Sequence, residues 1–153
     1  MTHKNILVIQ TAFIGDAILA SSILEKLHAF FPEAKISILV RKGNESLYSE
    51  HPFLTQTLVW NKQEGKYKSL FRLLKVIRQQ KFDTVINLHR FASSGFLTAF
   101  SKATYTAGYD KNPFSFLFNY KAKHKIGDGR HEVDRYNDLI ESITDKTVSK
   151  PKL

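Results

Sequence analysis

The side chain whose type and position best suit catalysis in this sequence is Asp16. It follows Gly15 in the turn after an apolar segment, where a helical pattern begins. A carboxylate held at such a turn can take a proton from a hydroxyl group, which is the work of a general base. An acidic side chain at a helix start can instead cap free backbone N–H groups and complement the helix dipole, and spacing alone favours the cap.

Basic side chains form a second candidate set, because they could bind an anionic ligand. Residues 1–60 carry five Lys or Arg and five Asp or Glu, whereas residues 61–153 carry eighteen against nine, so the second segment supplies the whole net charge of +9. Such a field attracts nucleic acid, a phosphorylated glycolipid or an acidic membrane surface without selecting among them, and a solvated surface explains it equally well.

Other kinds of chemistry find no support in the sequence. The turn after residues 5–10 holds a single glycine, so it is neither a dinucleotide fingerprint nor a phosphate-binding loop, and we expect no cofactor. Cysteine is absent, which removes thiolate metal sites. His131, Glu132 and Asp134 lack a second histidine four residues on that would place two ligands on one helical face, so we expect no metal site.

The elements that must position these side chains alternate between strands and helices. Four short, continuous apolar runs are typical of strands buried on both faces of a parallel sheet: 5–10, 34–40, 54–60 and 82–88. Helical spacing follows at several places: 18–31, a short helix within 43–52, 67–80, 91–101 and 131–143. The sequence therefore predicts an α/β fold, a Rossmann-like, doubly wound and mainly parallel sheet.

Ligands of such a sheet bind beyond the carboxyl ends of the strands. The loops after Gln10, Val40 and Leu88 are therefore the places where a site is expected. Arg41 and Arg90 lie at the ends of the second and fourth predicted strands, so we expect both close to the crevice that Asp16 faces.

One later stretch allows two interpretations. Four aromatic side chains within 113–125 alternate with period two, namely Phe114, Phe116, Phe118 and Tyr120. This alternation favours a strand packed on the core over an aromatic and basic surface that rests on an anionic membrane. Residues 107–109, Ala-Gly-Tyr, have the composition of a turn.

Residues 6–20, Ile-Leu-Val-Ile-Gln-Thr-Ala-Phe-Ile-Gly-Asp-Ala-Ile-Leu-Ala, resemble the opening of the bacterial heptosyltransferases of glycosyltransferase family nine. In that family a strand, a turn of small residues, a hydrophobic-Gly-Asp motif and a Leu-rich helix follow one another. Further motifs occur in the family's order up to about Ile143: Phe31-Pro32, Val40-Arg41, His51-Pro52, 82–88, 107–109 and 131–136. No single motif is highly specific, but the ordered set is.

The resemblance implies a GT-B fold of two domains and the inverting transfer of a sugar from a nucleotide-diphosphate donor to an acceptor of the lipopolysaccharide core. Asp16 matches the family's proposed catalytic base, which takes the proton of the acceptor hydroxyl as that oxygen attacks the anomeric carbon. The helix N-terminus would make this carboxylate a weaker base, and burial on closure of the two domains would offset that effect.

The resemblance also implies which residues meet the acceptor, a phosphorylated glycolipid. The expected contacts are Thr11, Gly15, Arg41, Arg90, Lys121 and Lys123. Residues 1–143 are expected to form the acceptor-side N-terminal domain, and 144–153 a polar tail or the start of a linker. We expect the nucleotide-sugar donor to bind only through a C-terminal domain that this chain lacks, so that the chain alone is inactive.

The sequence shows no signal-peptide pattern and no apolar span of about 18 residues, so we expect a cytoplasmic protein with peripheral contact at the inner membrane. The alternative function is a basic α/β module that binds nucleic acid or another anionic partner. The aromatic residues show no RRM-like pattern and no helix-turn-helix signal is present, so no nucleic acid is expected. A plain partner-binding domain is the third interpretation.

Overall fold

The computed structural model describes residues 3–123, 132–147 and 150–151. The strands are β1 (Asn5–Gln10), β2 (Lys35–Arg41), β3 (Leu54–Trp60), β4 (Thr84–Asn87), β5 (Tyr105–Tyr109) and β6 (Tyr120–Ala122). They form one sheet of six strands in the order β3-β2-β1-β4-β5-β6, and all neighbouring strands are parallel.

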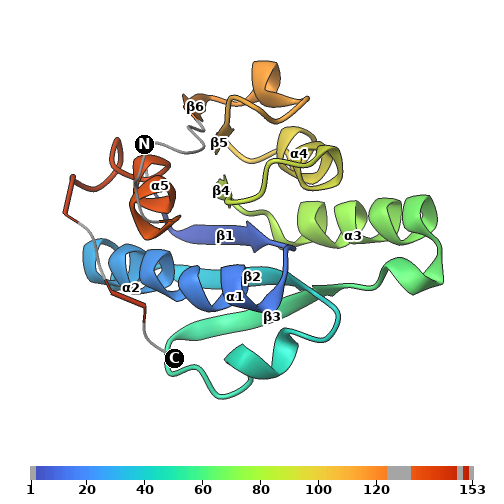
Figure 1. Cartoon of the computed structure of the whole chain (residues 1–153), viewed down its shortest axis with the longest axis horizontal. Helices are drawn as coiled ribbons and strands as arrows, with labels where there is room; N and C mark the ends of the chain where they lie inside the picture. Colours follow the sequence, from blue (N-terminus) through green and yellow to red (C-terminus); the bar gives the residue numbers. More distant parts are fainter. Residues whose placement is uncertain (1–2, 124–131, 148–149, 152–153) are drawn as a thin grey trace.

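Helices connect these strands (Figure 1). The α-helices are α1 (Ile14–Leu19), α2 (Ser21–Phe30), α3 (Lys66–Gln80), α4 (Ala92–Ala99) and α5 (Glu132–Asp138). The described residues also include the short 3₁₀ helices η1 (Glu45–Tyr48), η2 (Lys62–Glu64) and η3 (Ser115–Leu117). The predicted doubly wound α/β fold is confirmed.

The central strand β1 shows why the strands read as continuous apolar runs. Ile6 and Val8 belong to a buried cluster with residues of α2 and of α5. Leu7 and Ile9 point to the other face and pack with residues of α3 and α4. Both faces of the sheet are therefore covered by helices, so every position of the strand after Asn5 is buried.

The predicted first helix is interrupted, which the apolar spacing did not indicate. It forms α1 and α2, with Ala20 between them. The hydroxyl of Ser21 donates to the carbonyl of Ile18 at 2.7 Å, and that of Ser22 donates to the carbonyl of Leu19 at 2.8 Å. Serine hydroxyls that bond back to the preceding turn compete with regular helix geometry, and the break occurs at this point.

Two predictions in the second half of the chain are wrong. Residues 107–109 belong to β5 and do not form a turn. The glycine serves close packing instead, because a Cβ at Gly108 would lie 2.4 Å from the ring of Phe118. The predicted aromatic strand is also absent over Phe114–Phe118, where η3 leaves Phe116 72% exposed, and only Tyr120–Ala122 joins the sheet.

The last helix and the segment after it are tied to α2 by a buried lysine. The predicted helix over 131–143 ends at Asp138, and His131 lies outside the described residues. Lys26 on α2 is 2% exposed, and its Nζ donates to Oδ1 of Asn137 at 2.6 Å. It also donates to the carbonyls of Asp145 and Thr147. These contacts fix α5 against α2.

Within the described residues no helix is both long enough and apolar enough to cross a membrane.

Candidate functional site

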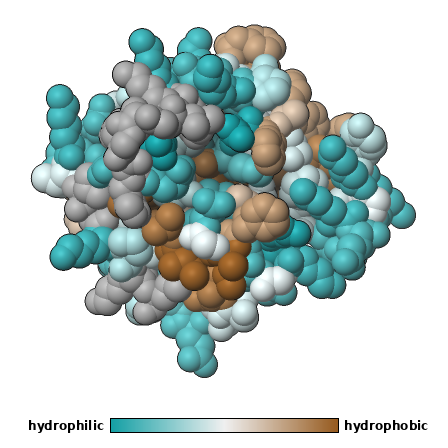
Figure 2. Space-filling view, in the orientation of Figure 1, coloured by the Kyte–Doolittle hydropathy of each residue, from teal (hydrophilic) through white to brown (hydrophobic). Residues whose placement is uncertain are grey.

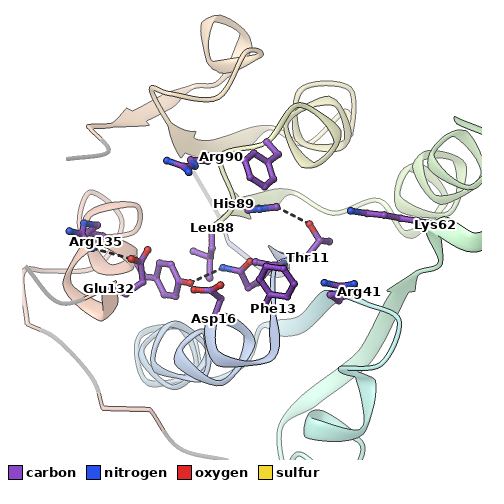
Figure 3. Close-up of a pocket in the computed structure, with 14 residues that line it drawn as sticks. Thr11, Phe13, Asp16, Arg41, Lys62, Leu88, His89, Arg90, Glu132 and Arg135 are labelled. Atoms are coloured by element: carbon purple, nitrogen blue, oxygen red, sulfur yellow. Dashed lines mark hydrogen bonds and ion pairs between the residues drawn. The ribbon is translucent and has the colours of Figure 1, made fainter. Parts of the chain in front are cut away.

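A pocket of about 420 Å³ opens at the carboxyl edge of the sheet (Figure 3). Its walls come from the loops after β1, β2, β3 and β4 and from α5. The lining residues are Gln10, Thr11, Ala12, Phe13, Asp16, Arg41, Lys62, Leu88, His89, Arg90, Phe91, Glu132, Arg135 and Tyr136. The site therefore lies where a parallel sheet is expected to bind ligands.

Asp16 lines this pocket as the third residue of α1. The N-cap position is Phe13, which makes no side-chain cap bond, and among the described residues the Asp16 carboxylate has no hydrogen-bond or ion-pair partner. Burial raises the pKa of the Asp16 carboxyl, and the nearby charge of Glu132 raises it further. Both effects favour the protonated carboxyl, which makes the Asp16 carboxylate a stronger base.

The pocket floor is held by a buried pair of polar side chains. Nε2 of Gln10, the last residue of β1, donates to the hydroxyl of Tyr136 on α5 at 2.7 Å. The side-chain Oε1 of Gln10 accepts from the backbone N–H of Ala12 at 3.0 Å. Gln10 and Tyr136 are each 1% exposed. One glutamine thus joins the β1 loop to α5 and sets the shape of the turn that leads to Asp16.

A neutral histidine occupies the next strand end. Nδ1 of His89, after β4, lies 3.1 Å from Oγ1 of Thr11. Burial lowers the pKa of His89 to about 4, and the positive charges of Lys62 and Arg90 contribute. Its imidazole is therefore uncharged at neutral pH and can exchange hydrogen bonds with a ligand without adding charge.

Cations surround this polar centre. Arg41, Lys62 and Arg90 line the pocket from the ends of three different strands. Arg135 also lines it, and its guanidinium lies 3.0 Å from the Glu132 carboxylate. Four cationic groups against the two carboxylates of Asp16 and Glu132 favour a ligand with negative charge.

The structure brings four of the predicted residues together: Thr11, Asp16, Arg41 and Arg90. Gly15 is exposed beside them but does not line the pocket. Lys121 on β6 and Lys123 just after it are exposed at the same edge of the sheet and also lie outside the pocket. Their role in acceptor binding stays a prediction.

Several lining residues were not anticipated. His89 directly follows the fourth apolar run, so the strand-end rule that selected Arg90 could have selected it as well. Gln10 is a polar residue ending an apolar strand, which is a similar signal. Glu132 was considered only as a metal ligand, and in the described part of the chain no group of three or more His, Asp or Glu could hold a metal ion.

Comparison with known sequences identifies the family. The family described as "Glycosyltransferase family 9 (heptosyltransferase)" matches residues 70–153, more than half of the chain. The chain belongs to glycosyltransferase family 9. The predicted resemblance is thereby confirmed.

Individual family 9 relatives extend the match over the rest of the chain. A lipooligosaccharide heptosyltransferase 2 of Haemophilus influenzae is 26% identical over 157 residues, covering 97% of this chain and 45% of the relative. A family 9 glycosyltransferase structure from Veillonella parvula is 24% identical with a TM-score of 0.84, covering 95% of this chain and 43% of that one. The chain therefore spans about half the length of these relatives.

A second solved structure has the same fold. The Escherichia coli heptosyltransferase WaaC with ADP-2-deoxy-2-fluoro heptose is 20% identical with a TM-score of 0.75, covering 97% of this chain and 50% of that one. At this level of identity the likeness establishes the shared α/β architecture.

Proposed function

We propose that this family 9 chain provides the acceptor side of a heptosyltransferase, which moves a sugar from a nucleotide-diphosphate donor to a lipopolysaccharide-core acceptor with inversion. The position and environment of Asp16 carry this proposal. Its carboxylate faces a pocket of about 420 Å³ at the carboxyl edge of a parallel sheet, and its pKa is raised. A base whose pKa approaches the working pH is better suited to removing a proton in the transition state.

In the proposed reaction Asp16 takes the proton of one acceptor hydroxyl. The hydroxyl oxygen forms a bond to the anomeric carbon of the donor sugar while the bond from that carbon to the diphosphate oxygen breaks. The nucleotide diphosphate leaves with the bonding electron pair from the opposite face, which inverts the configuration. The proton ends on the Asp16 carboxylate, so charge and atoms balance.

Glu132 tunes this base in the proposal. Its negative charge is the second cause of the raised pKa of Asp16. Arg135 holds Glu132 at 3.0 Å, so the like charge stays on the α5 side of the pocket (Figure 3). Asp16 is then the carboxylate left without a partner among the described residues, and it is free to accept a proton.

The acceptor in this proposal is a phosphorylated glycolipid. Arg41, Lys62 and Arg90 would contact its anionic groups, since all three line the pocket. The neutral imidazole of His89 would contact a sugar hydroxyl between them. We place the donor on the part of a heptosyltransferase beyond the half that this chain spans. The E. coli heptosyltransferase WaaC was solved with ADP-2-deoxy-2-fluoro heptose, which supports a nucleotide sugar as the donor.

A transfer assay tests the proposal. The full gene product would be incubated with ADP-heptose and one of two acceptors: a lipopolysaccharide core that ends before its first heptose, or one that ends after it. Mass spectrometry would then measure the mass of the products. We expect addition of one heptose to one of the two acceptors. Failure to modify either acceptor, together with salt-dependent binding of arbitrary DNA or RNA, would instead support the basic binding module.

We also propose that the protein works in the cytoplasm at the inner membrane, where α3 contacts anionic lipid. Its exposed side includes Lys68, Lys75 and Phe71, and the helix has no acidic residue. Figure 2 shows the surface over α3 as mostly hydrophilic. Cations beside an exposed aromatic ring suit the interface of an anionic bilayer.

Vesicle sedimentation tests this contact. We expect the chain to sediment with phosphatidylglycerol vesicles and to lose about thirtyfold in affinity when Lys68 and Lys75 are both changed to Gln, at ~1 kcal/mol per cation. Equal binding to neutral phosphatidylcholine vesicles would rule the electrostatic contact out.

A further inference from the structure

Two phenylalanines at the pocket are unusually exposed for large apolar side chains. Phe13 is 73% exposed and Phe91 is 55% exposed, and both line the pocket. They come from the loops after β1 and β4, which are neighbouring strands. Figure 2 shows hydrophobic side chains near the centre of this face, over α1, within a mostly hydrophilic surface. Exposed apolar groups at a cavity mark a surface that a ligand covers.

Each ring is backed by an arginine. The guanidinium of Arg41 lies 5.2 Å from the centre of the Phe13 ring, and that of Arg90 lies 5.6 Å from the Phe91 ring. The Phe91 ring also meets His89 edge-on, with ring centres 4.4 Å apart. A cation on one face of a ring restrains its orientation and leaves other parts of the ring for a ligand.

We propose that Phe13 and Phe91 form an aromatic clamp that holds a sugar ring of the acceptor by stacking. This inference rests on the proposed function and names the part of the acceptor that the pocket recognises. The C–H groups on one face of a pyranose are apolar and slightly positive, so they suit the negative face of an aromatic ring. The hydroxyl groups of the stacked sugar then lie around the edge of the sugar ring, where polar side chains can contact them.

The surroundings of the clamp fit a sugar better than an acyl chain. Apart from Ala12 and Leu88, the side chains that line the pocket beside the two rings are polar, including those of Thr11, Asp16 and His89. An acyl chain would leave the Asp16 carboxylate covered without a hydrogen-bond partner, which costs free energy, whereas a sugar hydroxyl can pair with it. Because Phe13 and Asp16 line the same pocket, we expect a sugar ring stacked on Phe13 to present a hydroxyl to the base.

Calorimetric titration tests the clamp. The ligand is a lipopolysaccharide core oligosaccharide freed of its acyl chains, titrated into the 153-residue chain. We expect Phe13→Leu and Phe91→Leu each to raise the Kd about threefold to tenfold, because leucine keeps apolar area but loses the ring face. Phe13→Trp keeps the ring and is expected to bind at least as tightly as the unmodified chain.

Phe116→Leu is the matched control. Phe116 is 72% exposed, close to the exposure of Phe13, but it lies on η3 and does not line the pocket. We expect it to leave the Kd unchanged. All these substitutions are at exposed positions, so thermal unfolding should change little and loss of fold would not explain a change in affinity.

The outcomes separate the clamp from the proposed function. If both leucine variants bind like the unmodified chain while Arg41→Gln binds more weakly, the pocket takes the acceptor but the clamp is wrong. If the unmodified chain does not bind the oligosaccharide, the acceptor assignment and the clamp are both overturned. If Phe116→Leu weakens binding as much as Phe13→Leu, the effect is not specific to the pocket and the clamp is again refuted.

Discussion

Replacing Lys26 with methionine is expected to destabilise the protein and to loosen the pocket wall that α5 provides. Lys26 on α2 is 2% exposed and donates to Asn137 of α5 at 2.6 Å and to the carbonyl of Asp145 at 2.5 Å. Asn137 is next to Tyr136, whose hydroxyl accepts from Gln10 in the pocket floor. The lysine therefore supports the geometry of the site from behind.

The size of the effect follows from what the ammonium group leaves behind. Removing the ammonium leaves Oδ1 of Asn137 and two carbonyl oxygens without their donor, which at about 1–3 kcal/mol per buried acceptor costs about 3–5 kcal/mol. The ion pair with Asp145 at 3.1 Å adds little, since that carboxylate is 46% exposed and exposed pairs contribute about 0–1 kcal/mol. Methionine keeps the apolar stem packed and recovers about 1 kcal/mol. We expect a net loss of about 2–4 kcal/mol, or roughly 5–12 °C in Tm for a chain of this size.

Urea unfolding followed by circular dichroism measures this loss. Lys75→Met is the control, because Lys75 is exposed on α3 and its replacement is expected to stay within about 0.5 kcal/mol of the unmodified chain. If Lys26→Met is as stable as the control, the buried ammonium does not hold α5 and the segment after it, and our account of how the pocket wall is fixed is wrong.

Three further predictions concern the site and the loops that carry it. Glu132→Gln removes a negative charge that raises the pKa of Asp16, so the acidic limb of the pH–rate profile should move to lower pH. An acidic limb that stays in place or moves to higher pH would show that Glu132 does not raise the pKa of Asp16. Asp16→Asn should raise Tm near pH 7, because the raised pKa of Asp16 means that its ionised carboxylate is less favourable in the folded state than in the unfolded state. Well below the unfolded pKa of about 3.9 the carboxyl is protonated in both states, so the substitution should not raise Tm there. If the variant and the unmodified protein have the same Tm at both pH values, the raised pKa is contradicted. Gly95→Ala would place a Cβ 1.9 Å from Oδ1 of Asn112 and should lower the free energy of unfolding in urea by about 1–3 kcal/mol. Gly15→Ala is the control, because a Cβ at Gly15 meets open space and should not destabilise the protein. If Gly95→Ala is as stable as the control, Asn112 can move away and the predicted clash is wrong.

Hydrophobic pattern was sufficient to predict the centre of the sheet. Residues 5–10 were predicted with the observed bounds, because a strand covered on both faces is a nearly continuous apolar run. The bounds of residues 54–60 were also predicted as observed, although β3 is an edge strand that is only partly buried. β5 was missed because Gly108 resembles a turn residue, and its true role depends on Phe118, ten residues further along. Contacts between side chains distant in sequence leave no local pattern.

The candidate site was predicted in part for the same reason. Residues at strand ends could be selected from the order of elements alone, and Arg41 and Arg90 do line the pocket. The contribution of α5 could not be anticipated, because Tyr136 reaches Gln10 across 126 positions of sequence. From the sequence alone Lys26 resembles a solvent-exposed charge on a helix, because the residues that bury it are more than 100 positions away.

The turnover of the full gene product with Asp16→Asn tests the central claim most directly, using ADP-heptose and the lipopolysaccharide-core acceptor that the unmodified protein accepts. Loss of a general base should lower kcat by about 10²–10⁴ while the affinity for the acceptor is kept, because asparagine retains the shape of the side chain but cannot take the proton. Turnover close to that of the unmodified protein would contradict the assignment of Asp16 as the base.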